Sequence, residues 1–302
     1  MPRRFAAEGA LIGAAFLYGL TFPLVHDALV DITPFAYLLG RFAIATLILM
    51  PFAISALRTP GPQRRLLVRV GLTAGVILFG GYATQTVGLQ YTSPSTSAFI
   101  TGLYVIITPV IESVISRRLP RPQVIAGIVI ATVGLYLLTG ADVSLGKGEL
   151  FTLACAALFA VHIVYIGAYA NRLAPTQFTV MQIAAVAFLS VVPTARQGVG
   201  TLSGLAIFAV VFTGVACSAV ALPLQLWGQR RIPATRAALI LLAEPVFAGI
   251  AGYVDGERLG AGRLVGAVAI MVGIGVSEFW PRRSVPPPHR SRDSLHPSEG
   301  VT

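Results

Sequence analysis

Long apolar runs dominate the sequence and restrict the folds open to it more than any other feature. Ten runs have roughly the length that an α-helix needs to cross a bilayer, about 20 residues for a hydrocarbon core of ~30 Å. The predicted spans are 10–30, 34–57, 70–90, 95–115, 123–139, 150–170, 174–193, 204–228, 235–254 and 262–280. Together they predict an all-α integral membrane protein with ten transmembrane helices.

The composition excludes most classes of soluble protein. Charged residues make up 11% of the chain, against about 25% in a soluble domain, so a soluble enzyme, a nucleic-acid-binding protein and a disordered scaffold are excluded. The two cysteines, Cys155 and Cys217, offer neither a metal-ligand spacing nor a disulfide framework. No nucleotide-binding motif is present, and we expect no cofactor and no metal.

Basic residues are distributed unevenly around the predicted spans. The chain has 22 Lys and Arg against 12 Asp and Glu. With the N-terminus inside, 17 basic residues fall on the inside and one, Arg41, lies within a span. Four fall on the outside, Lys147, Arg196, Arg258 and Arg263. By the positive-inside rule we expect a cell-membrane protein with both termini in the cytoplasm, and lipid headgroups as the partner of this charge. The Pro- and Arg-rich segment 281–302 is expected to be a disordered cytoplasmic tail.

The two halves of the chain resemble each other. Residues in or next to the first and fifth spans recur 139 positions later: Gly9, Leu11, Ala15, Gly127, Val133 and Gly134 recur as Gly148, Leu150, Ala154, Gly266, Val272 and Gly273. We therefore expect two five-helix repeats, residues 1–140 and 141–280. Because five is an odd number of spans, the repeats must be inverted relative to each other. Many secondary transporters have this architecture, with the substrate site near the bilayer midplane.

Several strings in the sequence point to a known family. The stretch 230–277 reads RRIPATRAALILLAEPVFAGIAGYVDGERLGAGRLVGAVAIMVGIGVS, and it resembles the terminal part of EamA-type proteins of the drug/metabolite transporter superfamily. AAFLYGLTFP (14–23), LLGRFAIATL (38–47) and QTVGLQYTSPSTSAFITGLYVIITPV (85–110) are similar to the matching parts of the first half. The resemblance covers about residues 8–280. It implies ten helices, two inverted repeats and carriage of small organic solutes, often by export.

Glu244 and Glu112 are the two acidic residues within predicted spans that we consider as candidates. A charged side chain at the bilayer centre costs about 2.5–3.5 kcal/mol on insertion scales, so it tends to face a cavity or a partner. Glu244 lies mid-span, and we expect it to bind a cationic group or to take up a proton; the alternative is a structural, protonated Glu hydrogen-bonded to a neighbouring helix. Glu112 lies near a span end and is expected to pair with Arg117 or Arg118.

Three prolines are predicted to interrupt helices. Proline lacks a backbone N–H and frees a carbonyl on the preceding turn. Pro245 follows Glu244 directly, and Pro109 is its counterpart in the first half, while Pro23 lies in the first span. Interrupted helices beside polar side chains commonly line the binding sites of carriers, so we expect Pro23, Pro109 and Pro245 to mark helix breaks near such a site.

Two basic groups within spans have two interpretations each. His162 could relay protons, since the pKa of a free histidine is near 6.5, or it could be a neutral packing histidine; a metal site is not expected without further ligands. Arg41 could attract an anionic group of the substrate. Alternatively it extends outward toward Asp27 or Asp31, and this structural interpretation is the one we favour.

Uncharged polar side chains complete the set of candidates. Tyr18, Gln85, Tyr104 and Gln182 lie within predicted spans, and carrier pockets combine a few polar groups with apolar walls. Each of them could instead bond across helices. The family resemblance implies a cavity drawn from helices one, three, four, six, eight and nine, which favours Tyr18, Gln85, Tyr104, His162 and Glu244 over Gln182.

These features predict a secondary transporter, with export the expected direction. It would carry a small organic metabolite across the cytoplasmic membrane by alternating access. Because no nucleotide-binding motif is present, an ion gradient would drive uphill transport, and protons are the candidate ion. Two alternatives stay open: an integral membrane enzyme acting on lipid-linked substrates, which would need a constellation such as clustered Asp, and a non-transporting membrane sensor or scaffold.

Overall fold

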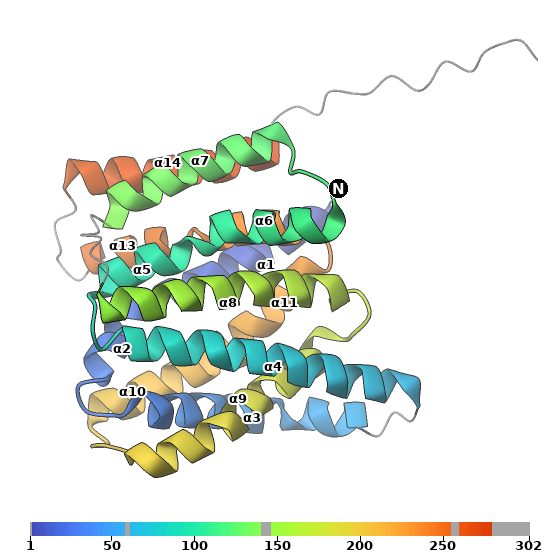
Figure 1. Cartoon of the computed structure of the whole chain (residues 1–302), viewed down its shortest axis with the longest axis vertical. Coiled ribbons are helices and arrows are strands. Elements are labelled where there is room, and N and C mark those ends of the chain that lie inside the picture. The colour runs from blue at the N-terminus through green and yellow to red at the C-terminus, as the bar shows by residue number, and fades with distance from the viewer. Residues whose placement is uncertain (1, 58–60, 140–145, 255–259, 280–302) are drawn as a thin grey trace, which may run out of the picture.

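The described backbone consists of helices joined by short connections (Figure 1). The computed structural model describes residues 2–57, 61–139, 146–254 and 260–279, and the tail expected at 281–302 lies outside them. The helices of the first half are α1 (Pro2–Gly19), α2 (Phe22–Ala28), α3 (Pro34–Leu57), α4 (Pro62–Gly88), α5 (Pro94–Gly102), α6 (Tyr104–Ser116) and α7 (Pro122–Thr139). Those of the second half are α8 (Lys147–Tyr169), α9 (Pro175–Gln197), α10 (Gly204–Phe212), the π-helix η1 (Thr213–Ala221), α11 (Leu222–Gln229), α12 (Ala234–Leu241), α13 (Glu244–Val254) and α14 (Ala261–Phe279).

Proline and serine mark where many of these helices begin. The helices α3, α4, α5, α7 and α9 each start at a proline, whose missing N–H costs nothing in the first turn and whose fixed φ suits a helix. Ser93 and Ser203 precede α5 and α10, and each side chain accepts a hydrogen bond from the backbone N–H three residues later, over 3.1 Å. The helix boundaries therefore follow from local sequence.

The apolar runs form helices of membrane-spanning length. Among the described residues, eight helical stretches are long and apolar enough to cross a bilayer, and they correspond to the first eight predicted spans. The predicted span 235–254 is divided into α12 and α13, and the last one is α14, whose apolar part Ala261–Ser277 is slightly shorter. The prediction of an all-α membrane protein is confirmed for the part of the chain described.

Helices of the two halves lie side by side. In Figure 1, α7 lies along α14 at one edge of the molecule, α3 lies along α9 at the other, and α4 packs against α8 and α9 between them. The α7–α14 contact depends on glycine: a Cβ on Gly127 would lie 2.6 Å from the carbonyl oxygen of Gly273, and one on Gly134 would lie 2.7 Å from that of Gly266. Such small residues let membrane helices approach closely.

Three of the apolar stretches are interrupted, although not always at the predicted proline. The first stretch breaks between Gly19 and Phe22, just before Pro23, and α13 begins at Glu244, just before Pro245. Pro109, by contrast, lies inside the continuous helix α6, so the break predicted there is wrong. The apolar stretch is instead interrupted at Leu103. Here the backbone N–H groups donate to the carbonyl three residues earlier, as in a 3₁₀ turn, in place of the α-helical bond to the fourth.

The eighth apolar stretch contains a π-helix that the sequence analysis did not predict. Between α10 and α11 the backbone adopts the nine-residue π-helix η1, Thr213–Ala221. Wider turns of this kind often occur at functional sites, because they turn side chains off the regular α-helical faces. Here η1 packs against both α1 and α3 and supplies Ser218, a partner of Arg41.

Candidate functional site

One cavity lies among the interrupted helices. Its volume is about 80 Å³, room for several water molecules at roughly 10–15 Å³ each. The six binding candidates predicted from the sequence all line it: Tyr18, Arg41, Gln85, Tyr104, His162 and Glu244. Both halves of the chain therefore contribute polar side chains to a single place in the fold.

Three of these six side chains lie where a helix is interrupted. Tyr18 is in the last turn of α1, Tyr104 is the first residue of α6, and Glu244 is the first residue of α13. Non-helical backbone at membrane depth is tolerated where it is buried in protein or lines a water-filled cavity. Each interrupted stretch thus contributes a polar side chain to the cavity wall at the point where its backbone leaves the regular helix.

Arg41 is held inside the bundle by hydroxyl groups. The side chain of this α3 residue is buried, only 4% exposed. Its Nε donates to the Ser218 hydroxyl over 2.8 Å, and its two terminal nitrogens donate to the hydroxyls of Tyr37 and Tyr82, both over 3.3 Å. The guanidinium also lies 4.6 Å from the centre of the Tyr82 ring, a cation–π contact.

The favoured interpretation of Arg41, an outward reach toward Asp27 or Asp31, is therefore wrong. Those carboxylates are neighbours in the sequence, but Arg41 lies on the face of α3 that meets η1 and α4. Three hydroxyl acceptors and an aromatic ring there offset part of the cost of desolvating the charge. Within the described residues, no carboxylate forms an ion pair with Arg41.

His162 is fixed by a residue that sequence reasoning set aside. Its Nε2 lies 2.6 Å from Oε1 of Gln182, and because an amide oxygen only accepts, the histidine nitrogen is the donor. Both side chains are buried, each about 3% exposed. Gln182 does not line the cavity, as expected, but it sets the orientation and tautomer of a histidine that does.

A row of amide groups extends from the cavity along α11. The Tyr18 hydroxyl donates to Oε1 of Gln225 over 3.1 Å, and Gln225 Nε2 donates to Gln229 over 3.4 Å. Gln229 in turn donates to the carbonyl of Ile163 in α8 over 2.9 Å. These bonds connect α1, α11 and α8 around the cavity. Gln85 has a longer contact, 3.5 Å, with the hydroxyl of Thr101.

The carboxylate of Glu244 is not held in place as the side chains of Arg41 and His162 are. Its side chain is only half-buried, and no residue of the described chain forms a hydrogen bond or an ion pair with it. The structural alternative for Glu244, a carboxyl bonded to a neighbouring helix, therefore has no partner to support it. The arrangement leaves the carboxylate available to a proton or to a cationic group in the cavity.

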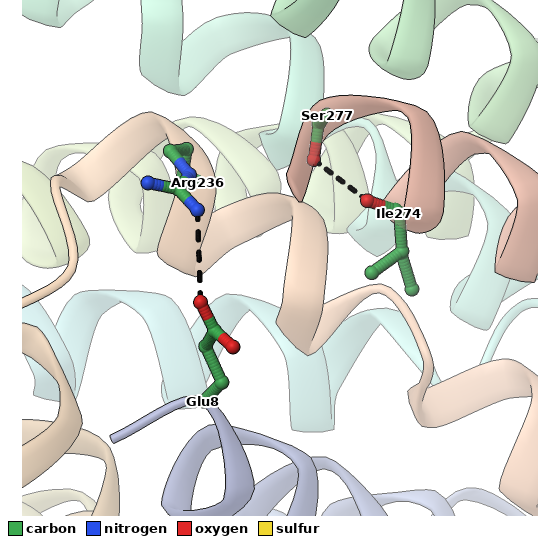
Figure 2. A network of polar contacts seen from close by, with 4 residues as sticks. All are labelled: Glu8, Arg236, Ile274 and Ser277. Atoms are coloured by element: carbon green, nitrogen blue, oxygen red, sulfur yellow. Dashed lines mark hydrogen bonds and ion pairs between the residues drawn. The ribbon is translucent and has the colours of Figure 1, made fainter. Parts of the chain in front are cut away.

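A second polar cluster joins three helix ends. The hydroxyl and the backbone N–H of Thr235, the latter over 2.8 Å, donate to one oxygen of Glu112. The ion pairs expected for Glu112 with Arg117 or Arg118 are therefore wrong: Glu112 instead caps the start of α12, where unpaired N–H groups attract a carboxylate. Figure 2 shows the neighbouring contact, in which Arg236 lies 3.7 Å from the carboxylate of Glu8 in α1.

The cavity-wall residues that sequence reasoning missed include Tyr37, Tyr82 and Gln225. Tyr37 precedes Arg41 by four residues, a spacing that puts both on one face of a helix, and this signal could have found it. Gln225 has the same spacing to Gln229. No comparable signal marks Tyr82, because its role depends on α4 packing beside α3. Among the described residues no group of three or more His, Cys, Asp or Glu could hold a metal.

Comparison with known proteins gives a consistent result. The model of the EamA-like transporter family matches the chain twice, over residues 6–140 and 146–278. An uncharacterised transporter of Archaeoglobus fulgidus is 32% identical over 250 residues, which are 82% of this chain and 77% of that protein. The uncharacterised transporter YyaM of Bacillus subtilis is 26% identical over 284 residues, 87% of this chain and 90% of YyaM.

The fold is also found among solved structures. One crystal structure of a protein with 20% sequence identity superposes with a TM-score of 0.77, covering 93% of this chain and 99% of the other. Both named relatives are described as transporters. The matched family is one of transporters, so the chain is a membrane transporter and not an enzyme. With the family model matched along nearly its whole length, this chain belongs to the EamA-like transporter family of the drug/metabolite transporter superfamily.

Proposed function

We propose that this transporter is a secondary carrier that exports a small organic metabolite across the cell membrane by alternating access. The observation that carries the proposal is the cavity, where polar and ionisable side chains of both halves meet at three helix interruptions. Buried polar groups with this placement are typical of the substrate sites of carriers.

The proposed architecture has ten spans in two inverted five-helix repeats, residues 1–140 and 141–280, with both termini in the cytoplasm. The family model matches each half separately, which supports the repeat. The glycine contacts support the inversion: Gly127 meets Gly273 and Gly134 meets Gly266. A two-fold axis that exchanges Gly127 with Gly266 and Gly134 with Gly273 converts one contact into the other.

Within this carrier, Glu244 is the proposed proton-coupling residue. It lines the cavity, begins a broken helix and has no partner in the described chain. A carboxyl in this position can bind a proton on one side of the membrane and release it on the other when the cavity changes its opening. Its exchange of a proton would link the movement of the solute to the proton gradient.

The test uses the full chain in proteoliposomes. A thermal-shift screen of the purified protein against a metabolite library first supplies a transported compound. The Glu244→Gln variant, which keeps size and polarity but cannot ionise, should lose uphill transport driven by a pH gradient and keep exchange of the compound at equal pH. Asp27→Asn is the matched control, since Asp27 is exposed and outside the cavity, and should transport normally. Normal uphill transport by Glu244→Gln would contradict proton coupling through this residue.

A further inference from the structure

Arg41 carries a buried positive charge that no described residue neutralises. Among the described residues that line the cavity, it is the only Lys or Arg, and no described carboxylate forms an ion pair with it. Glu244 lines the same cavity but lies beyond ion-pair distance. An isolated buried charge costs several kcal/mol in effective terms, so a site that retains one is poised to receive an anion.

The hydrogen bonds of Arg41 leave part of its guanidinium unused. The group has five N–H donors, and three bonds to protein acceptors account for three of them. Two N–H donors at the wall of the cavity are therefore left without an acceptor among the described residues. A guanidinium offers its donors as a planar fork, which matches the two oxygens of a carboxylate.

The hydroxyl groups around Arg41 fix the orientation of its guanidinium group. The Tyr37 hydroxyl donates to Thr213 over 2.9 Å, and Thr213 donates to the carbonyl of Ala209 over 2.6 Å. Because the Tyr37 proton is committed to Thr213, its oxygen is turned to Arg41 as an acceptor. Ser218 from η1 and Tyr82 from α4 fix the other nitrogens. The site is thus preorganised from three elements.

The other residues of the cavity wall indicate the charge of the bound anion and the polarity of the rest of the molecule. Leu78, Phe159 and Leu222 contribute apolar wall, so an apolar body can lie beside the charged group. One guanidinium matches one negative charge, whereas a phosphate monoester carries about −1.5 to −2 at neutral pH. Glu244 in the same cavity further disfavours a second negative charge. These features select a carboxylate rather than a phosphate.

We propose that Arg41 binds the carboxylate of the transported solute, which makes the substrate class a small organic carboxylate. This inference rests on the proposed carrier function and deepens it. The guanidinium anchors the charged end of the solute, the hydroxyls of Tyr37, Tyr82 and Ser218 hold the guanidinium, and the apolar wall receives the remainder of the molecule.

The binding test compares matched compounds on the purified full chain. Thermal stability is measured with small aliphatic and aromatic monocarboxylates, with their primary amides, with alkyl phosphates and with alkylamines. At least one carboxylate should raise the melting temperature where its amide does not. In Arg41→Met the apparent affinity for that carboxylate should fall roughly tenfold or more, as expected for the loss of a charge-assisted bond. Protection by amides, amines or phosphates alone would overturn the inference.

Two further variants guard against a simple folding defect. Arg41→Lys keeps the charge but loses the planar fork, so it should bind the carboxylate more weakly than the native protein while still preferring it to the amide. Arg196→Met, at an exposed position at the end of α9, should bind it normally. Carboxylate affinity unchanged in both Arg41→Lys and Arg41→Met would overturn the inference.

Transport in proteoliposomes separates this inference from the carrier function. If a carboxylate is taken up by the native protein but not by Arg41→Met, the result supports both the carrier function and the carboxylate site. Uptake of an uncharged or cationic compound at normal rates in Arg41→Met leaves the carrier function standing and contradicts the carboxylate site. Failure of the native protein to move any compound of the four classes or of the metabolite library contradicts the carrier function itself.

Discussion

At the residue scale, charges within the spans were predictable, but their partners were not. A charge in an apolar run is conspicuous in any fold because it is costly in the membrane, and so Arg41 and Glu244 stood out. The direction in which Arg41 points depends on which helices meet, and the nearest acceptors in the sequence, Asp27 and Asp31, were the wrong ones. Ser218, the actual acceptor for its Nε, is 177 residues away in the chain.

The pair formed by His162 and Gln182 leads to a prediction about stability. Gln182→Leu leaves the buried imidazole without its partner, and we expect it to lower the free energy of unfolding by about 1–3 kcal/mol. The double variant His162→Leu with Gln182→Leu removes both polar groups and should recover most of that loss. Melting temperatures in one detergent measure both. Equal destabilisation of the single and double variants would contradict a structural role for this bond.

At the element scale, the sequence predicted where apolar stretches lie better than where they break. Serine caps and prolines in first turns are local signals, and the structure uses them. The break at Leu103 and the π-helix η1 have no such signal, because tertiary packing decides where a strained turn is tolerated. The cap that Glu112 provides for α12 is also tertiary, since the two residues it joins are 123 positions apart.

The packing of α7 on α14 gives a prediction with a control on the same helix. A Cβ on Gly266 would lie 2.6 Å from the carbonyl oxygen of Gly134, whereas one on Gly275 would have nothing within 4 Å. We expect Gly266→Ala to destabilise the protein by about 1–3 kcal/mol, since the backbones would have to separate. Gly275→Ala should leave the melting temperature unchanged or raise it. Equal melting temperatures for the two variants would contradict the close helix contact.

At the scale of the whole molecule, hydropathy and charge predict a multi-pass membrane protein, and the family match agrees. The cavity is a property of the assembled bundle. Its six predicted residues come from α1, α3, α4, α6, α8 and α13, and sequence periodicity alone could not have put them together. The family resemblance indicated the helices of five of them, all but Arg41, and a polar or charged side chain within an apolar span indicated each position.

Access to this cavity from the two sides of the membrane is the most direct test of the carrier proposal. A cysteine at Thr101, a buried residue of the cavity wall, is introduced after Cys155 and Cys217 are replaced by alanine. A membrane-impermeant thiol reagent is then applied to one side of sealed proteoliposomes at a time. Val30→Cys, at a highly exposed position between spans, is the one-sided control.

Alternating access predicts that the cysteine at position 101 reacts with reagent from either side while the vesicles stay impermeable to it. The cysteine at position 30 should react from one side only. Reaction of the cysteine at position 101 from a single side, or from neither, under all conditions would contradict alternating access, and leakage of the reagent through the vesicles would indicate a pore instead of a carrier.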